Sequence, residues 1–113
     1  MFIKYNEYDL LELFESEPAS IADDPEAGEF IYTYKDNQNF KLILMLDVYQ
    51  LTCSLDITYK DFAVFTGVFQ NVTSIKKVEN FMVVSIGEEE RIKVKFTKQV
   101  GVELPKLLSC VEK

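Results

Sequence analysis

Histidine and tryptophan are absent from the sequence, and cysteine is rare, with two among 113 residues. Histidine is the commonest general base near neutral pH and a frequent zinc and copper ligand. Its absence therefore excludes the usual catalytic triads and most such metal sites. Cys53 and Cys110 are far apart and form no CxxC pair, which excludes a zinc knuckle and a thioredoxin-type redox site. We expect two reduced, mostly buried thiols.

Glycine and long apolar runs are scarce as well. The four glycines form no phosphate-binding loop, and no run approaches the roughly 18 apolar residues that a membrane-spanning helix needs. The N-terminus has one lysine and then acids, without the basic region, apolar run and cleavage site of a secretory signal. We therefore expect a cytoplasmic protein that is not an enzyme, binds no cofactor or metal, and has no membrane partner.

What is present is the composition of a globular protein. Hydrophobic residues make up 48% of the chain and charged residues 27%, which provides enough apolar material for one core at this length. We predict a single domain over residues 1–113, because two domains would need a longer chain.

Charge is distributed unevenly along the chain. The formal net charge is -7, and residues 5–34 contain nine acids and no lysine or arginine. The rest of the chain carries ten acids and all twelve basic residues, so it is nearly balanced. A one-signed acidic region repels nucleic acid and speeds encounter with a basic protein. We predict a partner-binding surface formed by Glu7, Glu12, Glu15, Glu17, Asp23, Asp24, Glu26 and Glu29.

The first third of the chain predicts a helix over residues 5–16, followed by an acidic connector over residues 17–28. Asn6 is a suitable N-cap. Pro18 disfavours helical backbone at the residue before it and ends the pattern. Four apolar residues recur at helical spacing and predict the buried face: Tyr8, Leu10, Leu11 and Phe14.

Residues 29–104 change to a period of two, which predicts strands joined by short polar connections and therefore antiparallel neighbours. The segment 62–72 also fits a helical face, but its β-branched and aromatic residues favour a strand. Glu79 and Asn80 suit a hairpin turn, because Asn tolerates positive φ. Residues 105–113 form a tail that could contain a helical turn. The predicted fold class is α+β, mainly β: an N-terminal helix on an antiparallel meander of about six or seven strands.

Three other groups of residues have a structural interpretation beside a functional one. A basic stripe would suit nucleic acid, but the apolar residues between its members have the opposite parity, so a charged solvent face is favoured: Arg91, Lys93 and Lys95. Two acids on strands expected to pair would suit glycoside hydrolysis, yet their polar parity favours solvated acids: Asp47 and Asp56. Four tyrosines are candidates either for a concave contact face or for packing beneath the helix: Tyr32, Tyr34, Tyr49 and Tyr59.

The chain resembles the small acidic immunity proteins of bacterial toxin systems. The resemblance lies in its size, in the acidic helix and loop of Glu7–Glu29, and in the meander that ends in SIKKVENFMVVSIGEEERIKVKF. It implies a cognate toxin as the partner and a bacterial cytoplasm as the location.

These observations favour a non-catalytic protein-binding module. We expect an acidic inhibitor of the immunity type that neutralises a basic protein partner. On its own it is expected to be a monomer or weak homodimer. A nuclease is one such partner, since an acidic surface can mimic phosphate charge. Two alternatives remain open. The first is a structural or oligomeric subunit of a phage or bacterial assembly, and the second is a carrier that holds an apolar ligand between helix and sheet.

Overall fold

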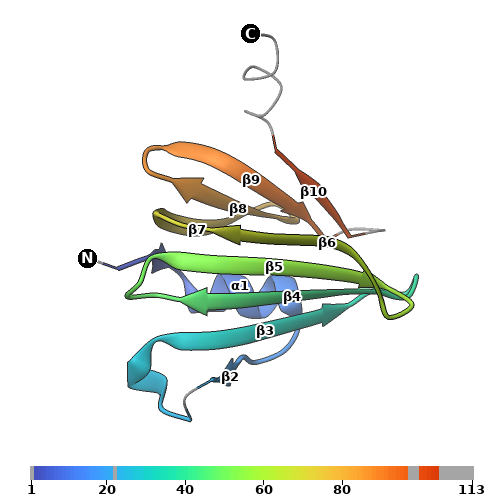
Figure 1. Ribbon diagram of the computed structural model, residues 1–113, viewed down its shortest axis with the longest axis horizontal. Helices are drawn as coiled ribbons and strands as arrows, with labels where there is room; N and C mark the ends of the chain where they lie inside the picture. The colour runs from blue at the N-terminus through green and yellow to red at the C-terminus, as the bar shows by residue number, and fades with distance from the viewer. Residues whose placement is uncertain (1, 22, 97–99, 105–113) are drawn as a thin grey trace, which may run out of the picture.

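The computed structural model of the protein describes residues 2–21, 23–96 and 100–104. This part of the chain forms two five-stranded sheets, and one helix, α1 (Glu7–Phe14), packs against both of them (Figure 1). The fold class predicted from the sequence, α+β and mainly β, is confirmed. The structure adds that the predicted meander is divided between two sheets.

Sheet 1 is antiparallel, with the strand order β2–β3–β4–β5–β6. The strands are β2 (Ala19–Ser20), β3 (Glu29–Lys35), β4 (Phe40–Asp47), β5 (Thr52–Tyr59) and β6 (Phe62–Phe69). A short 3-10 turn, η1 (Pro25–Ala27), precedes β3. The segment for which a helix was the alternative is therefore a strand as far as Phe69, and β2 and β6 are the two edges of this sheet.

Sheet 2 has the order β1–β7–β8–β9–β10, in which β1 runs parallel to β7 and the other pairs are antiparallel. Its strands are β1 (Lys4–Tyr5), β7 (Val72–Val78), β8 (Phe81–Ile86), β9 (Glu89–Lys95) and β10 (Gly101–Glu103). The predicted hairpin turn at 79–80 is present, but Glu79 rather than Asn80 has the positive φ, at 57°. The predicted tail, 105–113, lies outside the described residues.

The chain leaves sheet 1 for sheet 2 at Asn71. This residue has a φ of 59°, in the left-handed region that Asn tolerates better than most side chains. The next residue, Val72, donates its N–H to the carbonyl of Leu51 over 2.9 Å. The strand β7 is therefore tied at its start to the β4–β5 connection instead of pairing with β6.

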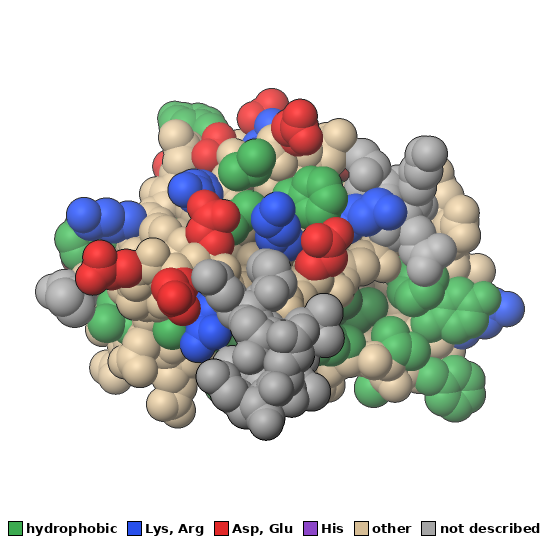
Figure 2. Space-filling model, turned by 90° about the horizontal axis from the view of Figure 1, so that it is seen from above, with side chains coloured by type: hydrophobic (Ala, Val, Ile, Leu, Met, Phe, Trp, Pro, Cys, Tyr) green, Lys and Arg blue, Asp and Glu red, His purple; other side chains and the backbone are tan. Residues whose placement is uncertain are grey.

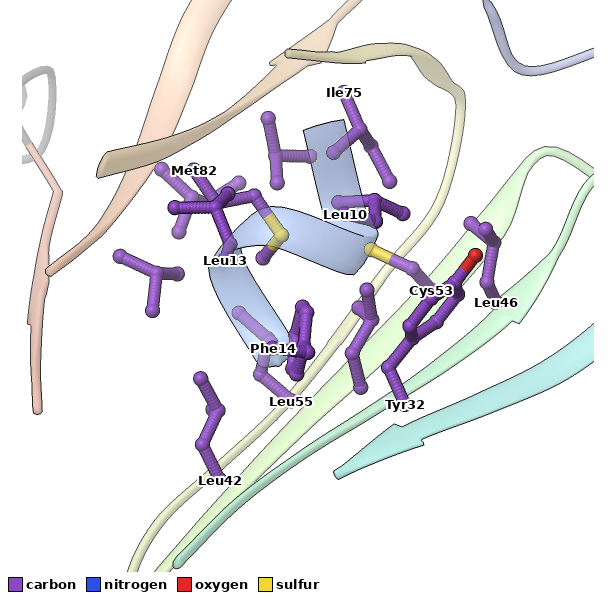
Figure 3. Close-up of a cluster of buried hydrophobic side chains, with 14 of the residues drawn as sticks. Leu10, Leu13, Phe14, Tyr32, Leu42, Leu46, Cys53, Leu55, Ile75 and Met82 are labelled. Carbon is purple, nitrogen blue, oxygen red and sulfur yellow. The ribbon is translucent and has the colours of Figure 1, made fainter. Parts of the chain in front are cut away.

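The core lies between α1 and the facing sides of the two sheets (Figure 3). Side chains of sheet 1 that point into it include Tyr32, Leu42, Leu46, Cys53 and Leu55. Sheet 2 contributes Ile75 and Met82, among others. Alternation along each strand places these residues on one face, as the period of two requires.

The helix is shorter than predicted, and its buried face is different. Asn6 caps it, accepting the N–H of Tyr8 at 2.8 Å, and Glu15 ends it in the left-handed conformation with a φ of 57°. Three helix residues are buried: Leu10, Leu13 and Phe14. The expectation that Tyr8 packs inward is wrong, because its side chain is 70% exposed. Leu13 takes its place, since it faces the core that both sheets supply.

Candidate partner-binding surface

Seven of the eight predicted acids are exposed, and Glu29 is half-buried at the start of β3. Two are on α1: Glu7 and Glu12. Two follow the helix: Glu15 and Glu17. Three lie in the β2–β3 connection: Asp23, Asp24 and Glu26.

The first group of acids comprises Glu7 and the acids of the β2–β3 connection. It lies at the end of sheet 1 that carries Tyr49, here called the Tyr49 end. The carbonyl of Gly28 accepts the N–H of Val48 at 2.8 Å, so the acidic β2–β3 connection and the β4–β5 turn meet there. The N–H of Ile3 donates to the carbonyl of Val48 at 2.9 Å, so the segment that leads into the helix lies close to the same end. Burial raises the pKa of Tyr5 there, and the charges of Glu7 and of an ionised Tyr49 add to that rise.

The second group comprises Glu15 and Glu17, which follow the helix, and it lies toward the opposite end of β3. Burial raises the pKa of Tyr34, and the carboxylates of Glu15 and Asp36 raise it further. The hydroxyl of Ser16 donates to the carbonyl of Thr33 at 3.0 Å, which holds the segment after the helix beside this end of the strand. The acids thus form two groups joined by α1, whose eight residues span roughly 12 Å.

The acidic connector is ordered by its own side chains. The carboxylate of Asp24 accepts the N–H of Glu26 at 3.1 Å, and the Asp24 N–H donates to the hydroxyl of Ser20, also at 3.1 Å. The N–H of Ile21 donates to the carbonyl of Glu29 at 3.0 Å. The connector is therefore a shaped loop that presents carboxylates at defined positions.

None of the eight acids forms an ion pair within the part of the chain that the structure describes. Its two ion pairs join Lys76 to Glu90 at 3.2 Å and Arg91 to Glu89 at 3.7 Å, and neither includes one of the eight acids. On the face seen from above in Figure 2, basic and acidic side chains are interspersed. The stripe on β9 is thus a mixed charged face, as its parity indicated, and the uncompensated charge belongs to the N-terminal third.

The other candidate groups are not brought together. Asp56 is opposite Ile43 and Asp47 is opposite Thr52, several residues apart along the strands. Asp47 accepts the N–H of Gln50 at 3.2 Å, which fixes the β4–β5 turn. Among the described residues, no cluster of three or more acids or cysteines is placed to hold a metal ion. None of the helices described is long and apolar enough to cross a membrane.

The four tyrosines do not share a concave face. Tyr32 is buried with its ring centroid 5.2 Å from that of Phe14, and burial raises its pKa. Tyr34 packs on Phe96 and donates its hydroxyl to the Phe96 carbonyl at 3.3 Å. Tyr49 is exposed. The interpretation that these rings pack beneath the helix holds for Tyr32.

Sequence reasoning missed two features of the surface. Tyr8 lies exposed beside Glu7 at the start of the helix, where it was expected to be buried. A hollow of about 410 Å³ opens on the outer face of sheet 1, lined by Met45 and Val68 of that sheet and by Ile21. The sequence signal for the hollow was the presence of apolar residues, such as Met45, at the positions of β4 that face away from the core. Buried Cys53 lies behind it, and burial raises the pKa of its thiol to about 12.

One solved structure similar to this chain belongs to a contact-dependent growth inhibition toxin–immunity protein complex from Klebsiella pneumoniae 342. The similarity covers 91% of this chain and 96% of that chain, with a TM-score of 0.75 and 20% sequence identity. At this identity the likeness shows a shared fold. The complex comes from the class of toxin system to which the sequence resemblance pointed. No family model matches the sequence, and no curated protein matches it significantly.

Proposed function

We propose that this protein is a non-catalytic module of the immunity type, which binds and neutralises a basic protein toxin in a bacterial cytoplasm. The observation that carries the proposal is the acidic N-terminal third, whose carboxylates are mostly exposed and form no ion pair among the described residues. The shared fold with a chain of a toxin–immunity protein complex supports it.

The charge distribution suits such a partner physically. An uncompensated patch attracts a basic protein over a distance of about one Debye length, roughly 10 Å at 0.1 M salt. Complementary patches of this kind raise association rates by roughly 10- to 1000-fold and orient the partners before contact. A toxin must be neutralised before it acts, so a fast association rate serves this function directly. Exposed Tyr8 and Tyr49 beside the acids add amphipathic contact area.

The carrier alternative receives no support from the geometry. The described hollows open on the surface, and no residue of α1 lines any of them. Behind the helix, side chains of both sheets pack against Leu10, Leu13 and Phe14 (Figure 3).

The first test is binding to the product of the gene adjacent to the one that encodes this chain. We expect co-purification of the two proteins, and relief of growth arrest when both are expressed together. A neighbouring product that neither binds nor arrests growth would remove the support for a cognate toxin.

The second test asks whether the acids are the contact surface. One variant neutralises the four acids on and directly after the helix, with Glu→Gln changes at 7, 12, 15 and 17. A second neutralises the acids of the connector and of the start of β3, with Asp→Asn at 23 and 24 and Glu→Gln at 26 and 29. A matched control removes four exposed acids elsewhere: Asp61, Glu79, Glu88 and Glu103. We expect the association rate at low salt to fall at least roughly tenfold in one or both test variants, with a flatter salt dependence. Equal rates in all three would place the contact elsewhere.

A further inference from the structure

Strand β6 forms an open edge of sheet 1. It pairs with β5 along its length, from Phe62 opposite Tyr59 to Phe69 opposite Cys53, and with no other described strand. Its sequence, FAVFTGVF, contains neither a charge nor a proline. The free N–H and C=O groups of such an edge are a template for another strand, and proteins usually protect them with charges, prolines or very short strands.

The side chains of β6 are apolar and unusually exposed. Phe62, Val64 and Val68 are 75%, 55% and 69% exposed. Figure 2 shows hydrophobic side chains gathered at the right-hand end of the molecule, where the β5–β6 turn lies in Figure 1. On the outer face of sheet 1, Val68 is in register with Ser54 and through it with Met45, so the edge continues into the hollow described above.

The two edges of sheet 1 are protected very differently. β2 has two residues and is followed by the acidic connector, so it offers a short, charged edge. β6 has eight uncharged residues. A register shift between Ile57 and Thr58 bulges β6 near Val64, but residues 65–69 beyond it stay in regular register with β5. At least this part of the edge is suited to pairing.

We propose that β6 pairs with β6 of a second copy of this chain, antiparallel, so that two copies of sheet 1 form one continuous sheet. An uncharged strand complements itself, because an antiparallel β6–β6 pair sets no like charges opposite one another. A basic partner would find no complementary charge on this strand. It would instead meet the acids of α1 and the connector.

Self-association at β6 uses a strand that carries none of the eight acids of the proposed partner surface. β2 and β6 are opposite edges of sheet 1, four strand spacings or roughly 19 Å apart along the sheet. Glu29 comes nearest, because it lines the same hollow as Val68. The two proposals therefore rest on different residues, and either one can fail without the other.

The test introduces charges of one sign or the other at two exposed positions of β6. One variant carries Thr66→Lys and Val68→Lys, and the other carries Thr66→Glu and Val68→Glu. Thr66 and Val68 are both exposed, so the fold should persist in each variant, and circular dichroism checks this. Val78→Lys on β7, another exposed valine, is the matched control. Sedimentation velocity over a wide concentration range measures the dimer.

We expect a concentration-dependent dimer for the unmodified chain and for Val78→Lys. Each charged variant alone should dimerise at least roughly a hundredfold more weakly, and an equimolar mixture of the two should recover the dimer. A chain that stays monomeric at every concentration overturns the proposal. So does a dimer that survives in both charged variants, or a mixture that fails to recover it. Charged variants that dimerise normally but no longer bind the toxin-like neighbour also overturn the proposal, because β6 would then belong to that contact.

Discussion

At the scale of single residues, Gly28 occupies a position where both backbone and packing exclude a side chain. Its φ is +77°, and a Cβ placed there would lie 2.7 Å from Cδ2 of Tyr49. We expect Gly28→Ala to lower the free energy of unfolding by roughly 1–3 kcal/mol, from left-handed strain and displacement of the Tyr49 ring. Urea denaturation measures this loss.

Two other glycines separate these contributions. Gly87 has a φ of +63°, but a Cβ at this position would meet nothing within 4 Å, so Gly87→Ala reports the backbone strain alone, roughly 1–2 kcal/mol. Gly101 is unobstructed and has no positive φ, so Gly101→Ala should change stability little. Equal losses at 28 and 87 would show that the Tyr49 ring moves aside at no cost.

Turn geometry shows what residue identity does and does not reveal. The hairpin at 79–80 was predictable from its flanking alternation, yet the positive φ falls on Glu79 rather than on Asn80. Lys60 and Asp61 also have positive φ, at 50° and 70°. The twist of the flanking strands sets these dihedral angles, so turn type depends on pairing that the turn sequence alone does not specify.

At the scale of elements, the buried face of α1 is the clearest case of a local pattern with two solutions. Tyr8, Leu11 and Phe14 fit helical spacing, and so do Leu10, Leu13 and Phe14. The structure selects the second set, because Leu10 and Leu13 lie in the core that both sheets supply while Tyr8 is exposed. Phe14 belongs to both sets and packs on Tyr32 and Phe96 at centroid distances of 5.2 and 5.0 Å. Tertiary packing made the choice that spacing left open.

A matched pair of substitutions tests this choice. Leu13→Ala should lower the free energy of unfolding by roughly 2–5 kcal/mol, because it leaves a cavity in the shared core. Tyr8→Ala should change it by no more than about 0.5 kcal/mol, since its ring is 70% exposed. Thermal or urea unfolding of both variants gives the comparison. A larger loss for Tyr8→Ala than for Leu13→Ala would restore the face that the spacing first indicated.

The strands were far more predictable than their grouping. Alternation marked β3, β4 and β5 because one face of each is buried and the other is not. The division into two sheets depends on Asn71 and on the bond from Val72 to Leu51. That contact joins segments about twenty residues apart, and no short-range pattern encodes it. The acidic surface was visible as composition, while its division into two groups required the fold.

At the scale of the whole molecule, the two sheets differ in the charges that they set opposite one another. Sheet 2 sets opposite charges across its strands, as where Glu103 lies opposite Lys93. Sheet 1 sets like charges opposite one another at both ends of the β3–β4 pair: Glu29 opposite Asp47 at the Tyr49 end, and Lys35 opposite Lys41 at the other. Like charges directly opposite are destabilising. The molecule therefore retains two unfavourable pairs in sheet 1, and the acidic pair lies at the proposed partner surface.

These pairings predict stability changes of opposite sign for one kind of substitution. Glu29→Gln should raise the free energy of unfolding by roughly 0.2–1 kcal/mol at low salt, because it removes repulsion with Asp47. Glu103→Gln should lower it by up to about 1 kcal/mol, because it removes attraction to Lys93. Both differences should shrink as sodium chloride is added, since salt screens exposed charges. Urea unfolding at low and high salt measures them. If Glu29→Gln were destabilising at low salt, its carboxylate would serve the fold, and the acidic end of sheet 1 would need no partner to explain it.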